Sequence, residues 1–398
     1  MENILSLPIW INGITNLSWW EHTLVALGLT HMTIISVTIY LHRYSAHRSL
    51  HLSPLLTHFF RFWLWMTTGM STKGWTATHR KHHAKCESPD DPHSPKVYGI
   101  KKVLFEGSEL YRAESINKAT LKKYGHGTPN DWIENNIYTP RSTWGVGLML
   151  ITNLVLFGPV GLSIWAVQML WIPITAAGVI NGIGHYWGYR NFQTEDASTN
   201  IIPWGILIGG EELHNNHHAY ASSARLSSKW YEFDVGWMYI QIFSFLKLAR
   251  VRKVAPRVSL QPTENECSVE TLRSVIFHRY EVLARFTQSI KTTFNEEINT
   301  LVTSNSCKIC DWGQFKNWLH GDLNQLEENE RITFQNLLNN SAILKTLYVM
   351  RQDLSNVWRQ STLTKEQLLE ELETWCKKAD QSGIVPLTNF SKLLRGYS

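Results

Sequence analysis

Long uncharged apolar runs dominate the first part of the chain and predict membrane-spanning helices. Residues 23–41 form 19 consecutive positions without a fully charged side chain, which at about 1.5 Å per residue is enough to cross ~30 Å of hydrocarbon. Residues 143–189 form 47 positions without Asp, Glu, Lys or Arg. That length predicts a hairpin of two crossings that turns near Gly158 and Pro159. A buried hairpin in the core of a soluble protein is the alternative interpretation.

Two further segments are apolar and aromatic but also carry charges. Residues 55–72 include His58 and Arg61, and a crossing there would put the histidine clusters described below on opposite sides of a membrane. We therefore expect this segment to be interfacial or re-entrant. Residues 229–253 combine Trp, Phe and Ile with a basic end. They predict a helix that lies on the membrane surface near anionic lipid head groups.

Composition divides the chain near Pro256. Residues 1–256 hold 22 basic and 16 acidic residues and 14 of the 18 Trp, whereas residues 257–398 hold 16 basic and 17 acidic residues. We expect a membrane domain in residues 1–256 and a soluble, helical C-terminal region of unknown role in residues 257–398.

Charged residues make up only 18% of the chain, and the basic and acidic residues nearly balance. This composition argues against a disordered chain and against nucleic-acid binding through basic charge.

The C-terminal region carries two local patterns. Thr364 and Gln367 form a capping box at the start of an amphipathic helix. Cys307 and Cys310 form a single CxxC. Since a zinc-ribbon or rubredoxin-like site needs two such pairs, we interpret these cysteines as incidental.

Basic residues predict the orientation in the membrane. They flank the apolar segments on the side that bears the histidine clusters: Arg43, Arg48, Lys73, Arg80, Lys81, Lys85 and Arg190. The positive-inside rule assigns this side to the cytoplasm. The first residues lack the basic start of a cleavable signal, so we expect the protein to stay in an inner membrane.

Histidines supply the candidate chemistry. Eight of the 17 histidines lie in three short clusters, namely His42 and His47, then His79, His82 and His83, then His214, His217 and His218. Residues three or four apart on a helix share a face, and neutral imidazole binds iron, zinc and copper well. His185 follows an apolar segment and adds a ninth imidazole. One such cluster could be a surface patch, but nine histidines on one side exceed the needs of a single ion and predict two metals.

The type of ligand favours redox iron over zinc. Zinc hydrolases usually keep three protein ligands per ion and an open position, which is a poor match to nine histidines. A pair of iron ions that activates O2 fits this ligand set better.

The clusters HxxxxH, HxxHH and HxxHH, with Asn181 four residues before His185, resemble the membrane fatty acid desaturases, in particular the bacterial acyl-CoA desaturases of the stearoyl-CoA Δ9 type. Neighbouring residues add to the resemblance over about residues 23–250: Trp75, Asp91-Pro92-His93, Gly188-Tyr189-Arg190 and Gly210-Glu211. It implies an all-α integral membrane protein with a cytoplasmic, His-rich diiron cap in a bacterial inner membrane. The implied metal ligands are His42, His47, His79, His82, His83, His185, His214, His217 and His218, with Asn181 binding one iron through water.

The resemblance also implies the reaction. An acyl-CoA 9-desaturase places a cis double bond in a palmitoyl or stearoyl chain, using two iron ions, O2 and two external electrons. The sequence lacks the His-Pro-Gly-Gly motif of a fused haem donor. We therefore expect a separate ferredoxin-type protein with its NAD(P)H reductase. Trp75 is a candidate wall for the bend in the substrate chain.

The sequence leaves alternatives open for the group that carries the acyl chain and for the reaction itself. The family's basic contacts to CoA do not map clearly, since the position two before His79 is Ala77. A membrane phospholipid acyl chain is therefore the second candidate substrate. A diiron alkyl hydroxylase would share the histidine clusters. A His-rich membrane metal carrier is the alternative that is not an enzyme.

Overall fold

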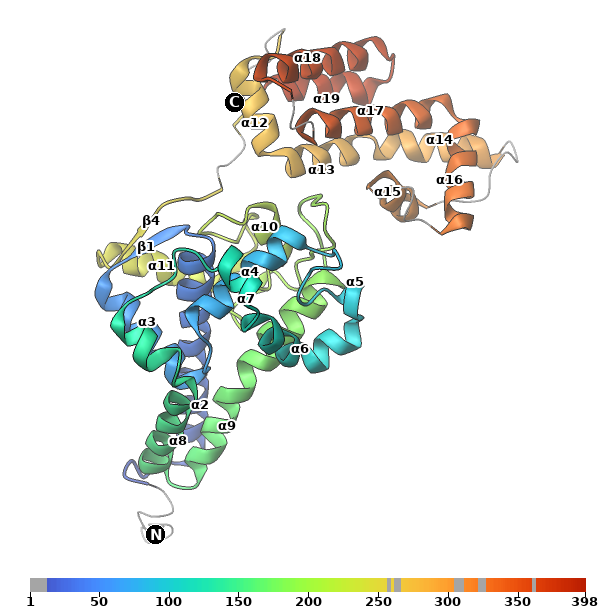
Figure 1. The fold of residues 1–398 in the computed structure, drawn as a ribbon. Coiled ribbons are helices and arrows are strands. Elements are labelled where there is room, and N and C mark those ends of the chain that lie inside the picture. Colours follow the sequence, from blue (N-terminus) through green and yellow to red (C-terminus); the bar gives the residue numbers. More distant parts are fainter. Residues whose placement is uncertain (1–12, 256–258, 261–265, 304–310, 321–326, 360–362) are drawn as a thin grey trace, which may run out of the picture. The chain divides into compact units, whose positions relative to one another are not determined.

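The computed structural model describes residues 1–398 except 1–12, 256–258, 261–265, 304–310, 321–326 and 360–362 (Figure 1). The chain divides into two compact units, Met1–Ala255 and Pro256–Ser398. Cys307 and Cys310 lie outside the described residues, so the interpretation of the CxxC stays a prediction.

The first unit is mainly helical. Its helices are α2 (Trp19–Ser36), η1 (Val37–Ala46), α3 (Pro54–Thr67), α4 (Thr72–Lys85), α5 (Pro95–Tyr98), α6 (Ile100–Ser115), α7 (Lys118–Tyr124), η2 (Glu134–Tyr138), α8 (Ser142–Phe157), α9 (Val160–Ile172), η3 (Pro173–Ile180), η4 (Ile183–His185), α10 (His214–Ala219) and α11 (Val235–Phe245). Its strands are β1 (Leu50–Leu52), β2 (Trp204–Gly205), β3 (Phe233–Asp234) and β4 (Ala249–Val251). β1 pairs with β4 in antiparallel fashion, and β2 pairs with β3 in parallel.

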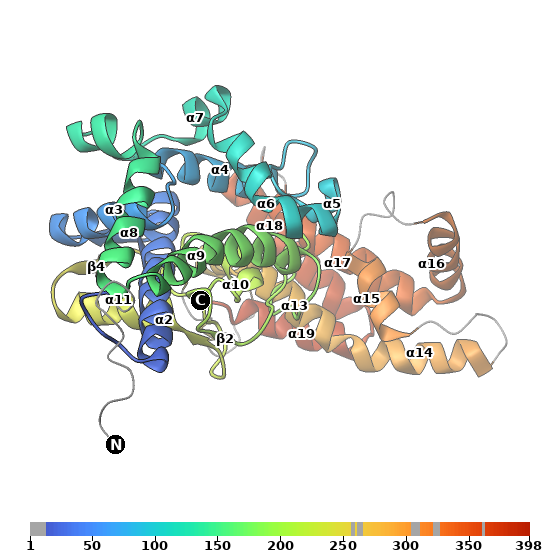
Figure 2. The same ribbon diagram turned by 90° about the horizontal axis from the view of Figure 1, so that it is seen from below.

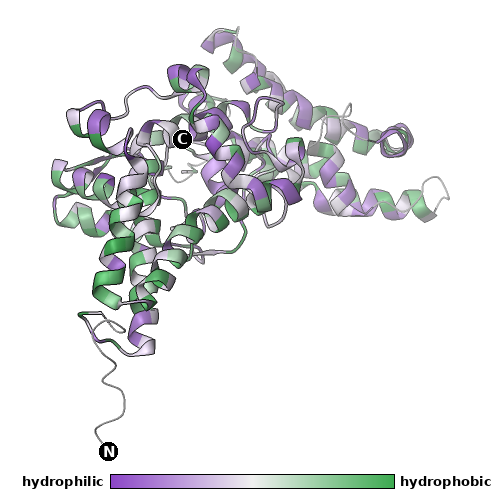
Figure 3. Cartoon of the chain, turned by 60° about the horizontal axis from the view of Figure 1, so that its bottom comes forward, coloured by the Kyte–Doolittle hydropathy of each residue, from purple (hydrophilic) through white to green (hydrophobic). Residues whose placement is uncertain are grey.

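Two helices of this unit are long and apolar enough to cross a membrane. α2 continues into η1 as the 28-residue helix Trp19–Ala46, and α9 continues through η3 to His185 as the 26-residue helix Val160–His185. α8 and α9 pack as a hairpin, and its predicted turn at Gly158 and Pro159 is confirmed. α8 has 16 residues and is shorter than the two candidate spans, so its membrane crossing stays a prediction. α9 also packs against α2. Figure 3 shows hydrophobic residues along these helices, and exposed apolar side chains suit a lipid environment.

α3 is short, and the charge that it carries is paired. Its 14 residues span about 21 Å. Arg61 is buried and bonds the Asp131 carboxylate at 2.6 and 2.9 Å and the Glu134 carboxylate at 3.0 Å. Ion pairs within the protein thus neutralise the charge of Arg61. The chain before α3 and the chain after it both reach the histidine cluster described below, so α3 does not separate them.

The segment over residues 229–253 differs from its prediction. The helix is shorter than expected: only Val235–Phe245 is helical, and it is flanked by the short strands β3 and β4. The Asp234 side chain caps α11 by accepting a hydrogen bond from the Trp237 backbone N–H. The pairing of β3 with β2 keeps Phe233 and Asp234 extended, so the helix cannot begin earlier. Ile240 packs inward, whereas Ile242 and Phe245 are exposed.

Two of the long helices change to π-helical geometry where they approach the histidines. η1 contains His42, and η3 ends just before Asn181. Single π-helical turns often occur at functional sites. α6 crosses η3 closely, because a Cβ atom on Gly107 would collide with the backbone carbonyl of Ala177. This close packing fixes the end of the helix that leads to His185 (Figure 2).

The described residues of the second unit form helices α12 (Val269–Phe277), α13 (Arg279–Ser289), α14 (Lys291–Thr303), α15 (Trp312–His320), α16 (Glu328–Asn340), α17 (Ala342–Arg359), α18 (Lys365–Gln381) and α19 (Val385–Arg395). They enclose a separate apolar core that includes Phe286, Phe334 and Trp375. The predicted capping box of Thr364 and Gln367 at the start of α18 is confirmed.

Candidate metal centre

Nine histidines from four helical segments meet in the first unit. η1 and its C-terminal cap supply His42 and His47, α4 supplies His79, His82 and His83, η4 supplies His185, and α10 supplies His214, His217 and His218. The structure divides them into two groups, although residues three and four apart are neighbours on a helix. On α10, for example, His214 and His218 face one group of imidazoles and His217 faces another. We call the group that contains His217 centre A and the group that contains His214 and His218 centre B.

Centre A comprises His42, His47, His79 and His217, whose ligand atoms all lie within 4.8 Å of one another. The Nε2 atoms of His47 and His79 are 2.8 Å apart, and those of His42 and His217 are 3.1 Å apart. His83 borders the same centre, with its Nε2 2.8 Å from Nε2 of His217. Centre A therefore brings five imidazoles together.

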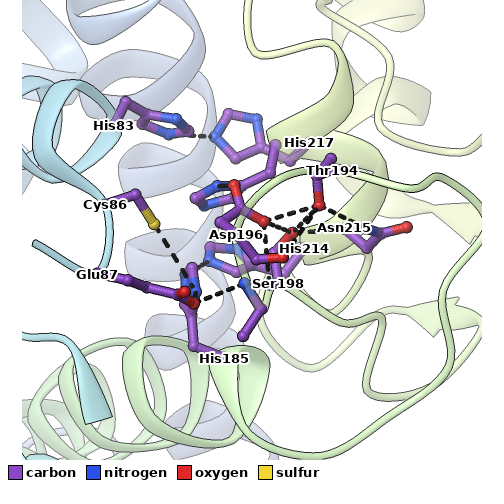
Figure 4. A network of polar contacts seen from close by, with 12 residues as sticks. His83, Cys86, Glu87, His185, Thr194, Asp196, Ser198, His214, Asn215 and His217 are labelled. Atoms are coloured by element: carbon purple, nitrogen blue, oxygen red, sulfur yellow. Dashed lines mark hydrogen bonds and ion pairs between the residues drawn. The ribbon is translucent and has the colours of Figure 1, made fainter. Parts of the chain in front are cut away.

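Centre B comprises His82, His185, His214 and His218, again with all ligand atoms within 4.8 Å. Nε2 of His185 lies 3.2 Å from Nε2 of His82 and 3.0 Å from Nε2 of His214. Figure 4 shows His185 and His214 beside the acidic residues that surround this centre. The ring of His83 stacks on His218 at 4.4 Å, so the two centres are adjacent.

Carboxylates contact the outer nitrogens of four of these imidazoles. His42 Nδ1 is 2.7 Å from Glu211, His82 Nδ1 is 3.0 Å from Asp91, and His218 Nδ1 is 2.8 Å from Asp196. His185 Nδ1 is 3.7 Å from Glu87. A carboxylate on Nδ1 keeps the proton there and leaves Nε2 as a lone-pair donor, which is the usual arrangement around a metal-binding histidine.

The inner nitrogens fit a cation. His82 and His185 both have carboxylates beside Nδ1, so their Nε2 lone pairs face each other across 3.2 Å. Nε2 of His218 is buried and has no hydrogen-bond partner among the described residues. Buried polar atoms normally have partners, and a positive ion between these nitrogens would supply one.

Burial keeps five of the nine imidazoles neutral. It holds the pKa of His47, His79, His83, His214 and His217 well below 6.5, and neighbouring imidazoles add to this effect. Burial opposes ionisation of Asp91 and Asp196, but the facing His82 and His218 outweigh it and lower the pKa of both carboxyls. Neutral imidazole is the form that binds metal.

Three other residues singled out in the sequence lie at or near the centres. Trp75 stacks face to face on His79, with ring centroids 4.9 Å apart at 14°. Asn181 is half-buried at the end of η3, four residues before His185. His93 is buried and stacks on His82 at 4.4 Å.

Sequence reasoning missed several residues of the site. Glu87 and Asp196 had no signal in the sequence. Glu87 accepts a hydrogen bond of 2.5 Å from the backbone of Ala197, in a distant segment, and Asp196 reaches His218 from an irregular loop. Asp91 and Glu211 appeared only as parts of motifs. The thiol of Cys86 lies 4.0 Å from His185 Nδ1. Burial and the nearby carboxylates of Asp196, Asp91 and Glu87 raise its pKa, which keeps the thiol protonated.

Comparison with known proteins identifies the first unit. Residues 18–245, more than half of the chain, match the family model of the fatty acid desaturases. The chain belongs to the fatty acid desaturase family. Among curated proteins, this desaturase is 32% identical to the Delta-9 desaturase-like 3 protein of Arabidopsis thaliana over 237 residues, 58% of this chain and 76% of that protein.

Two further relatives have names that specify a substrate. The Delta-9 acyl-lipid desaturase 1 of Arabidopsis thaliana is 28% identical over 236 residues, 58% of this chain and 74% of that protein. The sn-1 stearoyl-lipid 9-desaturase of Anabaena variabilis is 29% identical over 248 residues, 60% of this chain and 86% of that protein. This desaturase is an oxidoreductase of lipid metabolism and a membrane protein, and its family generally uses a diiron centre and O2.

The second unit has a different similarity. Residues 273–398 match a family model described as transposase. The match covers less than half of the chain and shows similarity alone. Among the described residues, the groups of His, Cys, Asp and Glu close enough to hold a metal ion all lie in the first unit.

Proposed function

We propose that this desaturase introduces a cis double bond at carbon 9 of a saturated palmitoyl or stearoyl chain, with two iron ions and O2. The observation that carries the proposal is the convergence of nine buried or half-buried imidazoles on two adjacent centres. A single hydrolytic metal would need fewer ligands. All-imidazole centres without a thiolate suit iron that reacts with O2.

We assign five imidazoles to one iron and four to the other. Centre A takes His42, His47, His79, His83 and His217, and centre B takes His82, His185, His214 and His218. Asn181 is one helical turn from His185, and we assign it to the iron of centre B through a water molecule. Centre B has one imidazole fewer than centre A, which leaves a coordination position for that water.

The protein's own residues position the substrate and exclude water. When bound, the iron pair supplies the oxidation that removes two hydrogens from adjacent methylenes. Trp75 covers His79 with its indole face, and we assign it to the wall that holds the acyl chain beside centre A. Holding the chain in one place determines which carbons react. The carboxylates of Glu211, Asp91 and Asp196 hold the imidazoles in one tautomer.

The substrate carrier has two candidates. The sequence predicts acyl-CoA, whereas the names of two relatives, an acyl-lipid desaturase and a stearoyl-lipid desaturase, favour an acyl chain in a membrane lipid. Ala77, where the family has a basic residue, also favours the lipid, because it cannot pair with a CoA phosphate. We therefore propose a lipid-bound chain as the second candidate, with the same double-bond position.

The remaining assignments follow the sequence. We propose a bacterial inner membrane, with both centres facing the cytoplasm, as the place of the reaction. Electrons would come from a separate ferredoxin-type protein and its NAD(P)H reductase.

The test is product analysis in whole cells. The full chain and its His217→Ala variant would be expressed in a host with a compatible ferredoxin, and the fatty acids analysed by gas chromatography and mass spectrometry after derivatisation. A new cis monoene at carbon 9, missing from the variant, is expected. A hydroxylated chain would contradict desaturation and favour the hydroxylase. Feeding labelled acyl-CoA or labelled phospholipid to membranes distinguishes the two carriers.

A further inference from the structure

The two centres are similar in their imidazoles but differ in their carboxylates. Around centre B, Asp91 contacts His82, Asp196 contacts His218, and Glu87 lies near His185. Each of the three carboxylates approaches a different imidazole from its Nδ1 side. Asp91 is fully buried, so water screens its charge little.

These carboxylates are held in place by other polar groups. Asp196 accepts hydrogen bonds from the Thr194 and Ser198 hydroxyls at 2.7 and 2.5 Å (Figure 4). Asp91 accepts one from the Glu87 backbone N–H at 2.7 Å. Their positions beside the imidazoles are therefore fixed before any metal binds.

Centre A has a single carboxylate among the described residues. Glu211 contacts His42 at 2.7 Å and accepts a hydrogen bond of 2.7 Å from the Thr38 hydroxyl. The contacts found for His47, His79, His83 and His217 are with other imidazoles and with Trp75. Centre B thus has three carboxylates and centre A has one.

Nearby cations do not remove this difference. At centre B, Lys96 pairs with Glu87 at 2.8 Å, and Arg190 donates to the Thr194 carbonyl at 2.7 Å. At centre A, Arg43 is paired with Asp234 at 2.8 Å, whereas Arg80 donates to the Ser45 and Ala46 carbonyls at 2.7 and 2.9 Å. At centre B, the two cations Lys96 and Arg190 do not balance three carboxylates, so the net charge is negative. At centre A, Asp234 neutralises Arg43, and Arg80 balances Glu211, so the net charge is close to zero.

We propose that the two metal positions are electrostatically inequivalent, so that centre B holds the ferric ion when the pair contains one ferric and one ferrous ion. The inference rests on the proposed function, because both centres must bind iron. A carboxylate that shares the Nδ1 proton makes the imidazole a stronger donor. Negative charge nearby also stabilises the ion of higher charge.

The test uses the full chain loaded with 57Fe in detergent and fully reduced. One equivalent of ferricyanide per chain removes one electron from the iron pair and becomes ferrocyanide. Mössbauer spectra then separate the ferric signal from the ferrous signal, and a redox titration gives the potential of the first oxidation. Two variants that keep the side-chain shape probe the two centres: Asp196→Asn at centre B and Glu211→Gln at centre A.

The two variants should have opposite signatures. Asp196→Asn should change the ferric signal and raise the potential of the first oxidation, whereas Glu211→Gln should change the ferrous signal and leave that potential unchanged. Asp91→Asn provides a second variant of centre B, with the same expectation, if Asp196→Asn loses iron. A ferric signal that responds to Glu211→Gln, or equal responses to both variants, would overturn the inference. Fewer than two irons in the unaltered protein would overturn the proposed function as well, and metal analysis of the same sample separates these outcomes.

Discussion

Asn216 donates a hydrogen bond of 2.8 Å from its Nδ2 to the buried carboxylate of Glu232. Its Oδ1 accepts hydrogen bonds from Asn191 at 2.8 Å and Asn200 at 3.0 Å. Asn216 lies between His214 and His217 on α10, which has only six residues. So short a helix is unstable by itself. The loop contacts of Asn216 therefore hold α10 so that its histidines reach both centres.

Asn216→Asp should weaken iron binding. The new carboxylate would face Glu232 in a buried site, and the repulsion would move α10. We expect a loss of about 10–100-fold in iron affinity, the usual effect of removing a group that orients metal ligands. Iron retained after dialysis against a graded chelator measures the loss. Asn329→Asp, at an exposed position of α16, is the control and should retain iron like the unaltered protein.

Trp75 should control the position of the double bond. Trp75→Ala removes the ring that covers His79, so the acyl chain can shift, and a small misplacement can cost on the order of 100-fold in rate. We expect a slower reaction and a mixture of double-bond positions, whereas Trp75→Phe should keep a single position. Mass spectrometry of derivatised products reads the positions. A single position at normal rate in Trp75→Ala would exclude this role.

Arg61 should be needed for stability. Arg61→Leu would leave Glu134, which is 4% exposed, as an unpaired buried carboxylate, and breaking such a pair typically costs about 3–5 kcal/mol. Thermal unfolding in detergent measures the change. The double variant Arg61→Leu with Glu134→Leu removes both charges and should recover part of the loss. No difference between the single and double variants would contradict the pairing.

The metal-free protein should lose stability in mild acid. Burial lowers the pKa of His47, His79, His83, His214 and His217. In the unfolded chain these groups take up protons as the pH falls below about 6.5, but in the folded protein they remain neutral. The unfolded state then binds more protons, so the free energy of unfolding falls with pH. Chemical unfolding of metal-free protein at a series of pH values tests this, and a midpoint that is constant between pH 7 and 5 would contradict it.

The sequence predicted the parts of the molecule that depend on local spacing. Helical spacing predicted that the histidines of one cluster lie on a common side of their helix, but not that His217 joins centre A while His214 and His218 join centre B. Uncharged length predicted the hairpin with its turn at Gly158 and Pro159. The helix over residues 229–253 was predicted too long, because hydropathy could not reveal that β3 pairs with β2. The carboxylates of Glu87 and Asp196 were not predicted at all. Glu87 contacts a distant segment, and Asp196 reaches His218 from an irregular loop, so neither role leaves a periodic pattern in the chain.

The most direct test of the diiron proposal is the iron content of the purified full chain, together with single-centre variants. The protein is expected to hold two irons per chain, one for each group of histidines. His47→Ala in centre A and His185→Ala in centre B should each lower the content toward one, and both should abolish the double bond in whole-cell fatty acids. One iron per chain in the unaltered protein, unchanged by either substitution, would contradict the account.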